Sequence, residues 1–438
     1  MQVCCWACRL KLDRSVIMSA ELKKQVCDII DGMADELVEA SHAIHAKPEI
    51  AFEEKFAHGL LTDKVEAAGL AVERHACGLD TAFISTFGEG DTEVGILSEY
   101  DALPGLGHAC GHNIIATTGL GASLALAKLN GELPGKVRYL GTPAEESGNG
   151  KELMARQGAF DGLDAAMMVH PAGIDLITMP SLAVNEVRVT YTGKAAHASA
   201  MPFAGVNALD ALVTAYQSIA QLRQHIKQSE RIHGIFNEAG LAPNIVPDHA
   251  VGTFYVRAEN GLALAELKSR VQNCFEAGAL AAGCDVQIDW ALGDYLEIKE
   301  SWAIAERYKQ NAESLGRDFF PLEKMPSSGA GSTDMGNISH RVPSIHPMIA
   351  CAPPSVVIHN PEFAKWAGSE RGDKAVIDGA KSLAMTAIDV LTDRKMMLQA
   401  KEDFAATAEF SAQSIAQAWH GEGGHENGDA ALGGCGCC

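Results

Sequence analysis

One short stretch of the chain gathers side chains that bind metal ions. The stretch, SEYDALPGLGHACGHN, begins at Ser98, and its possible ligands are Glu99, Asp101, His108, Cys110 and His112. No fold requires imidazole, thiol and carboxylate groups at this density, whereas a metal ion binds all three. The apolar run that leads into it predicts a buried parallel strand ending at a Pro/Gly loop. Because α/β proteins place ligands at the C-terminal ends of such strands, the stretch predicts a metal site.

Two later motifs repeat this arrangement. KVRYLGTPAEES predicts a strand over 136–141 followed by Glu145 and Glu146, and LDAAMMVHPA predicts a strand over 165–169 followed by His170. If the strands run parallel, the three strand ends meet at one rim of the sheet. Taken alone, PAEE would suit a solvated acidic turn and HACGH a buried polar turn. Their shared position at strand ends favours the metal site.

The number of ligands decides how many ions could bind. One catalytic ion needs about three protein ligands and an open position for water, and two ions bridged by a water need about five ligands and a separate base. The candidate ligands are Cys110, His112, Glu146, His170 and His359, which follows the strand-like SVVIH. Glu145, adjacent to a ligand, suits the general base. A cysteine ligand favours Zn²⁺, with Mn²⁺ as the alternative, as one ion or two.

The elements around these motifs predict a discontinuous α/β domain. Between 183 and 296 the pattern changes to β-α-β-β-α-β, the order of a split βαβ sandwich, and we interpret this part as an insertion. We therefore expect a catalytic domain formed by 20–182 and 297–395, with the second domain inserted at 183–296. Residues 1–19 and the polar, Gly- and Cys-rich residues 402–438 are expected to be disordered tails.

Composition limits the partners and the compartment. The 438 residues are 47% hydrophobic, carry a formal charge of −21 and have a pI near 5.2, which argues against nucleic acid or an anionic membrane as partner. The sequence contains no run of about 20 apolar residues, and its N-terminus does not match a secretory signal. Cysteines crowd the two ends of the chain, so we expect mostly free thiols and a cytoplasmic location. The terminal clusters could bind metal, accept lipid or have no role.

The ordered motifs resemble the M20 family of metallo-amidohydrolases and dipeptidases, over about residues 20–395. The motifs that carry the resemblance are AIHAKPEIAFEE, SEYDALPGLGHACGHN, GTPAEESGNGK, TGKAAHASAMPFAGVNALDA, APNIVPD and SVVIHNPEF. The branch resembled includes p-aminobenzoyl-glutamate and auxin-conjugate hydrolases and dipeptidases that release a basic residue. The resemblance implies a zinc-peptidase-like three-layer catalytic domain with an inserted ferredoxin-like lid, through which the chain would form a homodimer.

The resemblance also implies roles for single residues. By similarity Cys110, His112, Glu146, His170 and His359 bind the metal, and Glu145 takes a proton from the attacking water. His197, in GKAAHASAMP, is similar to a lid histidine that steadies the oxyanion, in dimeric members from the partner subunit. Asn244 and Arg257 are similar to lid groups that hold the substrate carboxylate. The chain departs from the common HACGHDGH at Asn113, which places the tuning of His112 in doubt and leaves an orienting role to Asp101.

The implied substrate is a dipeptide or N-acyl amino acid with a free carboxylate. A dipeptide that ends in a basic residue, such as β-alanyl-lysine, is the preferred choice. The alternatives are p-aminobenzoyl-glutamate, an aryl or indolyl amino-acid conjugate, and a binding protein that has kept the fold without catalysis. The loop SSGAGSTDMGN, with Asp334, could line a specificity pocket or be a Gly/Ser turn without ligand contact.

Overall fold

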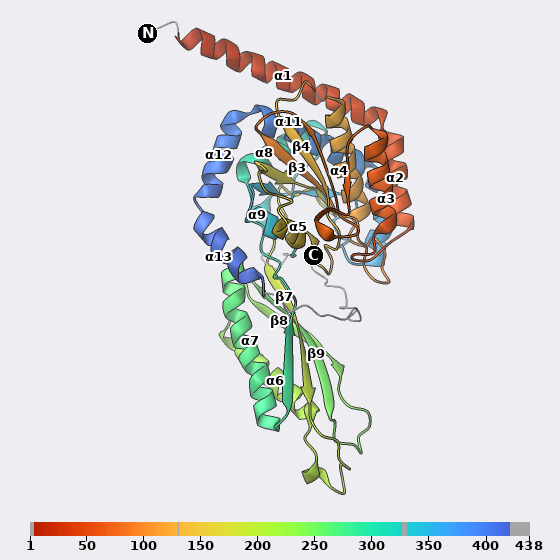
Figure 1. Ribbon diagram of the computed structural model, residues 1–438, viewed down its shortest axis with the longest axis vertical. Coiled ribbons are helices and arrows are strands. Elements are labelled where there is room, and N and C mark those ends of the chain that lie inside the picture. The colour runs from red at the N-terminus through yellow and green to blue at the C-terminus, as the bar shows by residue number, and fades with distance from the viewer. Residues whose placement is uncertain (1–3, 130, 326–330, 421–438) are drawn as a thin grey trace. The chain divides into compact units, whose positions relative to one another are not determined.

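The computed structural model describes the backbone of residues 4–129, 131–325 and 331–420, and side chains from Met18 onward within these ranges. The chain divides into two compact units. Unit 1 contains the residues up to Pro180 and Ile298–Ala408, and unit 2 contains Ser181–Glu297 and the segment that begins at Glu409 (Figure 1). The described chain therefore passes between the units three times.

Unit 1 is built on a six-stranded sheet. In spatial order its strands are β1 (Glu73–Arg74), β2 (Phe83–Gly88), β4 (Lys136–Gly141), β3 (Glu93–Ser98), β5 (Ala165–Met167) and β11 (Ser344–Ile345). The four strands β4, β3, β5 and β11 are parallel, while β1 and β2 are antiparallel to their neighbours. Every residue of β3 is buried, as expected for a central strand covered on both faces.

Helices cover both faces of this sheet. On one face lie α1 (Cys4–Gly32), α2 (Ala34–Ala46), α3 (Lys55–Ala67), α4 (His112–Lys128), α8 (Trp302–Ser314) and α11 (Glu370–Thr392); the other face carries α5 (Gly150–Arg156) and α9 (Met335–Ser339). Neighbouring strand residues point to opposite sides, so Ile96 joins the first core and Leu97 the second. These three layers confirm the predicted α/β class.

Small residues let α4 approach β3 closely. A Cβ atom added at Gly119 would lie 2.2 Å from the hydroxyl of Ser98, well inside van der Waals contact. The Ser98 hydroxyl instead donates a 2.9 Å hydrogen bond to the carbonyl oxygen of Ala116. The end of β3 and the start of α4 are thereby fixed against each other.

Unit 2 has the predicted order β-α-β-β-α-β. Its elements are β7 (Ala183–Thr192), α6 (Ala208–Leu222), β8 (Arg231–Glu238), β9 (His249–Ala258), α7 (Gly261–Ala282) and β10 (Asp285–Trp290). The antiparallel sheet has the order β10-β7-β9-β8, so β8 is an edge strand. Helices α6 and α7 pack on one face of it through a continuous apolar core (Figure 1).

Both expected tails are partly helical, which corrects the prediction of disorder. Helix α1 already begins at Cys4, because 4–20 contain no Gly or Pro and continue the pattern of the following helix. At the other end α12 (Arg394–Ala405) and α13 (Ala408–Ala418) occupy part of 402–438. The stretch that forms α13 is rich in helix formers, and its Ser411 and Ser414 are buried. Residues 421–438, with the C-terminal cysteines, lie outside the described part.

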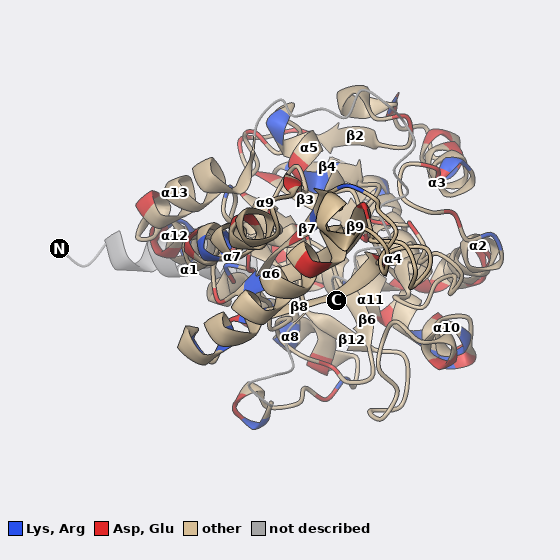
Figure 2. Ribbon diagram, turned by 90° about the horizontal axis from the view of Figure 1, so that it is seen from below, with Lys and Arg blue, Asp and Glu red and all other residues tan. Residues whose placement is uncertain are grey.

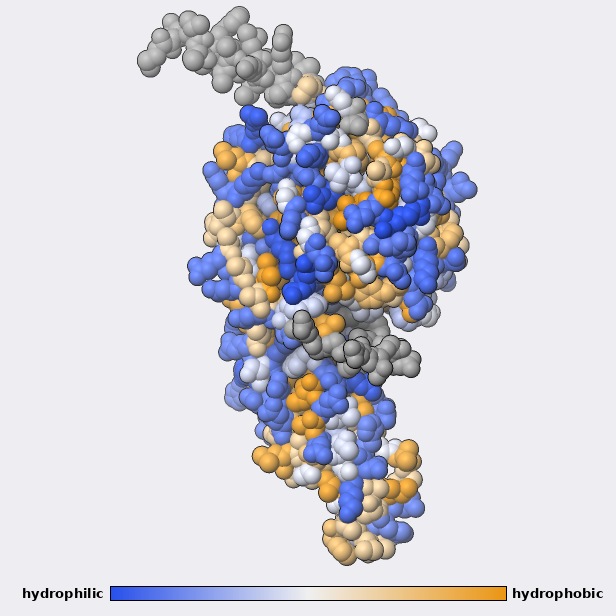
Figure 3. All heavy atoms as spheres, viewed as in Figure 1, coloured by the Kyte–Doolittle hydropathy of each residue, from blue (hydrophilic) through white to orange (hydrophobic). Residues whose placement is uncertain are grey.

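The surface, the helix lengths and the described cysteines have the following properties. Acidic and basic residues are interspersed along helices such as α10 (Pro361–Ala367; Figure 2). Hydrophobic side chains also reach the surface of unit 2, where Phe203 is 83% and Leu241 92% exposed (Figure 3). Among the described residues no helix is long and apolar enough to cross a membrane. The six cysteines whose side chains are described are not in disulfide bonds.

Candidate functional site

Three parallel strand ends and two turns position the candidate site. Glu99 and Asp101 follow β3 directly, and α4 begins at His112. After β4 the chain turns through Ala144, a non-glycine residue with the left-handed φ of 59°, immediately before Glu145. Such a conformation is costly, and its place beside a candidate base suggests that it serves the site.

His170 lies three residues after the last residue of β5 and not directly at its end. It is the first residue of β6 (His170–Ala172), which pairs in parallel with β12 (Met348–Ala350). His359 follows an irregular segment instead of the expected strand and has a left-handed φ of 62°. Its N–H donates a 2.8 Å hydrogen bond to the carbonyl oxygen of Ala109, which ties this turn to the HACGH segment.

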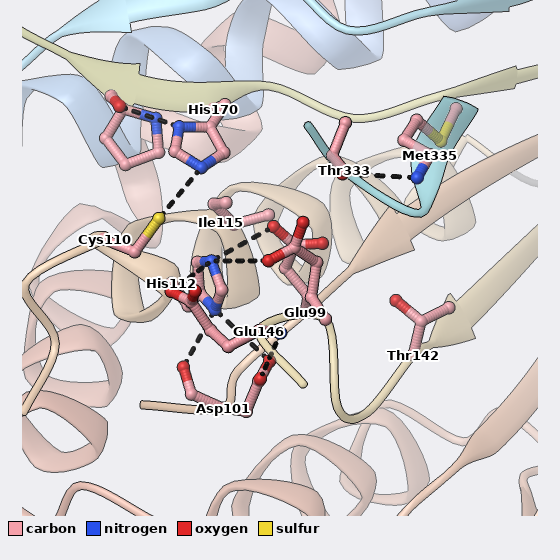
Figure 4. A network of polar contacts seen from close by, with 12 residues as sticks. Glu99, Asp101, Cys110, His112, Ile115, Thr142, Glu146, His170, Thr333 and Met335 are labelled. Atoms are coloured by element: carbon pink, nitrogen blue, oxygen red, sulfur yellow. Dashed lines mark hydrogen bonds and ion pairs between the residues drawn. The ribbon is translucent and has the colours of Figure 1, made fainter. Parts of the chain in front are cut away.

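The buried ring of His112 is oriented by Asp101. Its Nδ1 lies 2.8 Å from the carbonyl oxygen and 3.3 Å from the carboxylate of Asp101. With Nδ1 as donor, Nε2 of the neutral ring keeps its lone pair. Nε2 faces carboxylate oxygens of Glu99 at 3.4 Å and Glu146 at 3.8 Å (Figure 4). A carboxylate oxygen of Glu145 also lies 3.8 Å from Nε2.

The ring of His170 is also oriented by a contact between its Nδ1 and a backbone carbonyl oxygen. Its Nδ1 lies 2.8 Å from the carbonyl oxygen of Pro171, and its Nε2 lies 3.3 Å from Sγ of Cys110 (Figure 4). Nε2 of His359 lies 3.6 Å from a carboxylate oxygen of Glu146, and these two residues form a second group of possible ligands with Cys110. Two sets of possible ligands therefore share Cys110.

The donor atoms fit metal ions in composition and spacing. The sets are Cys110, His112 and His170; Cys110, Glu146 and His359; and Glu99, His112 and Glu145, with the ligand atoms of each set within 4.8 Å of one another. Ligand atoms about 2.1 Å from a tetrahedral ion lie roughly 3.4 Å apart, close to the separations of 3.3–3.8 Å found here. The buried Nε2 of His112 has no hydrogen-bond partner among the described residues.

Electrostatics make the site attractive to cations. Burial alone would lower the pKa of His112, but the carboxylates of Glu99, Asp101 and Glu146 raise it to about 10. Burial also opposes ionisation of Asp101, yet the contact with His112 and the backbone N–H of Glu146 lower its pKa. The carboxylates around His112 therefore stabilise a positive charge at this position.

Asn113 has a structural role. Its amide nitrogen donates to the hydroxyl of Ser41 at 2.9 Å and to the carbonyl oxygen of Ala367 at 3.0 Å. These contacts join α4 to α2 and to the end of α10, while Asp101 supplies the contact to His112. Asp334, which was considered as a residue that lines a specificity pocket, is buried. One of its carboxylate oxygens lies 2.6 Å from Nζ of Lys151.

The remaining candidate residues belong to unit 2. His197 and Asn244 lie on adjacent exposed loops: His197 forms a β-bridge with Ile245, and the N–H of Ala198 donates to the carbonyl oxygen of Asn244 at 3.0 Å. Arg257 lies in β9, with its guanidinium 5.8 Å from the ring centre of Tyr255. The first two residues are thus brought together within unit 2, and Arg257 lies on a strand.

Sequence reasoning missed Glu54. This buried carboxylate accepts hydrogen bonds from the N–H of Ala144 at 2.8 Å and the hydroxyl of Thr81 at 2.7 Å. Burial and the negative charge of Asp101 raise the pKa of Glu54 to about 7. Glu54 therefore fixes the strained turn that presents Glu145. It is the last residue of the motif AIHAKPEIAFEE, but the motif does not indicate which group it contacts.

His346 was also missed, although a signal existed. It follows β11, the fourth parallel strand, and its ring lies 5.5 Å from that of His170. The rule that chemistry gathers at parallel strand ends would have found it. This signal is weak, because the strand is only two residues long and gives no clear pattern in the sequence.

Comparisons with known proteins match this architecture. Residues 95–387 match the model of peptidase family M20/M25/M40. The chain is 40% identical to Xaa-Arg dipeptidase of Mus musculus over 398 residues, which cover 87% of this chain and 92% of that protein. It is 26% identical to one of the p-aminobenzoyl-glutamate hydrolase chains of Escherichia coli over 455 residues, 87% of this chain and 95% of that protein.

A solved structure shares the fold. It is a dinuclear metal-binding peptidase of the M20 family from Bacillus subtilis, with a TM-score of 0.61 and 20% sequence identity. The match covers 82% of this chain and 99% of that one.

Proposed function

The chain belongs to peptidase family M20/M25/M40, and we propose that it hydrolyses dipeptides or N-acyl amino acids that carry a free carboxylate. The observation that carries this proposal is the buried donor set around Cys110, with Glu145 beside it. We propose dipeptides that end in a basic residue as the preferred substrates, supported by the 40% identity to mouse Xaa-Arg dipeptidase.

Two divalent ions are proposed to bind at this donor set. Cys110, His112 and His170 would hold one, and Cys110, Glu146 and His359 the other. The mixture of thiolate, imidazole and carboxylate favours Zn²⁺, with Mn²⁺ as the alternative. When bound, such ions polarise the scissile carbonyl and lower the pKa of water.

The side chains of the protein would then move the protons and hold the substrate. Glu145, 3.8 Å from Nε2 of His112, takes the proton of the attacking water and returns it to the leaving amine, a role worth about 10²- to 10⁴-fold in rate. His197 would steady the oxyanion, a contribution of about 3 kcal/mol. Asn244 and Arg257 would hold the free carboxylate of the substrate.

In this proposal unit 1 is the catalytic domain and unit 2 the lid through which two chains pair. The edge strand β8 supports pairing because Ile235 and Phe236 are 63% and 38% exposed, and an open edge readily adds a second strand. The exposed loop position of His197 would allow it to serve the partner's site. Mixing H197A with E145Q tests this, since only heterodimers with a trans-acting His197 regain activity.

The proposed location is the cytoplasm. It is supported by the six cysteines whose side chains are described. They are distributed over both units, and none of them forms a disulfide bond. Reaction with a thiol reagent under denaturing, non-reducing conditions, read by mass spectrometry, would count the reduced thiols.

A substrate panel tests the proposed specificity. We expect β-alanyl-lysine and Xaa-Arg dipeptides to be hydrolysed with higher kcat/KM than p-aminobenzoyl-glutamate or an indolyl-acyl aspartate. The relationship to the Escherichia coli hydrolase makes p-aminobenzoyl-glutamate the second candidate. A higher kcat/KM for the Glu-terminated amide would show that p-aminobenzoyl-glutamate is the better substrate. If none of these compounds is hydrolysed, the binding protein without catalysis becomes the better interpretation.

A further inference from the structure

A buried lysine lies behind the candidate metal site. Lys151 is the second residue of α5, six positions after Glu145, and it is fully buried. The chain between them is tightly folded: the N–H groups of Gly148 and Gly150 both approach the carbonyl oxygen of Ala144, at 3.0 and 3.4 Å. A Cβ atom at Gly150 would lie 1.9 Å from the carbonyl oxygen of Pro143, so this fold requires glycine.

The ammonium of Lys151 joins two carboxylates. Its Nζ lies 2.5 Å from Oε2 of Glu99 and 2.6 Å from Oδ1 of Asp334, and all three side chains are buried. The backbone N–H of Lys151 donates to the second oxygen of Asp334 at 2.9 Å. Asp334 therefore holds both the backbone and the side chain of Lys151. Burial alone would lower the pKa of Lys151, but Asp334, Glu99 and Glu145 raise it, so the ammonium remains charged.

The two oxygens of Glu99 face different partners. While Oε2 contacts Lys151, Oε1 lies 3.4 Å from Nε2 of His112, the atom expected to bind the metal. Glu99 thus connects a fixed protein cation to the position where His112 would hold an ion. Without Lys151, Glu99 could rotate or could itself become a ligand.

From these contacts we propose that Lys151 and Glu99 are positioning residues of the metal centre: Lys151, held by Asp334, fixes Glu99 against His112. This inference rests on the proposed function, because it requires a metal ion at His112. The alternative is a purely structural ion pair that joins α5 to α9. If Lys151 is a positioning residue, its loss should weaken metal binding more than an equal loss of stability elsewhere in the protein does. A purely structural ion pair predicts no such extra effect.

The test compares the affinity of the full-length protein for Zn²⁺ in three variants, by competition with a chromophoric chelator. We expect K151M and E99Q each to bind Zn²⁺ about 10- to 100-fold more weakly than wild type, the range typical of outer-shell changes, because each variant disturbs the carboxylate held beside the metal-binding Nε2 of His112. The double variant should bind Zn²⁺ only slightly more weakly than the weaker-binding single variant. Both substitutions interrupt the same series of contacts from Lys151 through Glu99 to His112, so their effects should not add. The absorption spectrum of the Co²⁺-substituted protein should change in parallel.

The matched control is K268M in unit 2. Lys268 is also buried and lies 2.6 Å from a carboxylate oxygen of Asp294, so its loss costs a similar ion pair without touching the site. We expect K268M to lower the melting temperature and leave Zn²⁺ affinity unchanged. Wild-type affinity in both K151M and E99Q, or equal weakening in K268M, would overturn the proposal. E99Q decides alone if K151M does not fold. A wild-type protein that takes up no metal would instead overturn the proposed function.

Discussion

Removal of the Glu54 side chain should weaken both the fold and the catalysis. The carboxylate accepts hydrogen bonds from two buried donors, the N–H of Ala144 and the hydroxyl of Thr81. A buried donor left without an acceptor costs about 1–3 kcal/mol, so E54A should lose roughly 2–6 kcal/mol of unfolding free energy. Because Ala144 directly precedes Glu145 in a strained turn, displacement of the base should also lower kcat, by about 10²-fold.

Urea denaturation and steady-state kinetics of E54A, E54Q and E49A measure both effects. Glu49 also accepts backbone hydrogen bonds with its carboxylate, but these come from Phe56 and Ala57 at the start of α3 and not from Ala144. E49A should therefore lose about 1 kcal/mol with kcat unchanged. E54Q keeps one oxygen acceptor and should be intermediate. Wild-type stability and kcat in E54A would refute the role assigned to Glu54.

Two further predictions concern pH and metal removal. Burial raises the pKa of Glu300 to about 8, against a hydrogen bond from Thr178. Since this folded-state value exceeds the ordinary 4.5, stability is lost as pH rises through that interval. Chemical denaturation should show E300Q more stable than wild type at pH 9, by on the order of a few kcal/mol, and similar to it near pH 5; equal stability at pH 9 would contradict this. Dialysis against a chelator should lower the melting temperature and Zn²⁺ should restore it, since an ion that binds only the folded state stabilises it; an unchanged melting temperature in calorimetry would argue against a metal centre.

Strand periodicity and ligand chemistry predicted much of the candidate site. Buried runs before Glu99, Glu145 and His170 indicate parallel strands, and parallel strands bring their C-terminal ends to one edge. The structure places these groups together, with His170 displaced by three residues from the end of β5. The β-α-β-β-α-β order of unit 2 was also predicted, and the burial alternates along β7 while α6 has a clear apolar face.

Residues that act through tertiary contacts could not be predicted. Glu54 and Lys151 each end one of the family motifs, but they are distant in sequence from the groups they contact, 90 residues from Ala144 and 183 from Asp334. Charged residues also usually lie in solvent, so their burial was not expected. The residues near Trp419 were expected to be disordered because their contacts, too, are with residues distant in the sequence. Trp419 bridges Gly293, and His420 lies 3.0 Å from Asp294, contacts within unit 2 that a local pattern cannot reveal.

The most direct test of the central claim is the activity and metal content of E145Q. The glutamine keeps the shape of the side chain and removes its capacity to accept a proton. We predict a Zn²⁺ content equal to that of wild type and a kcat for β-alanyl-lysine or an Xaa-Arg dipeptide lowered by about 10²-fold or more. Retention of the wild-type rate by metal-loaded E145Q would contradict the assignment of Glu145 as the base of a metal-dependent hydrolase.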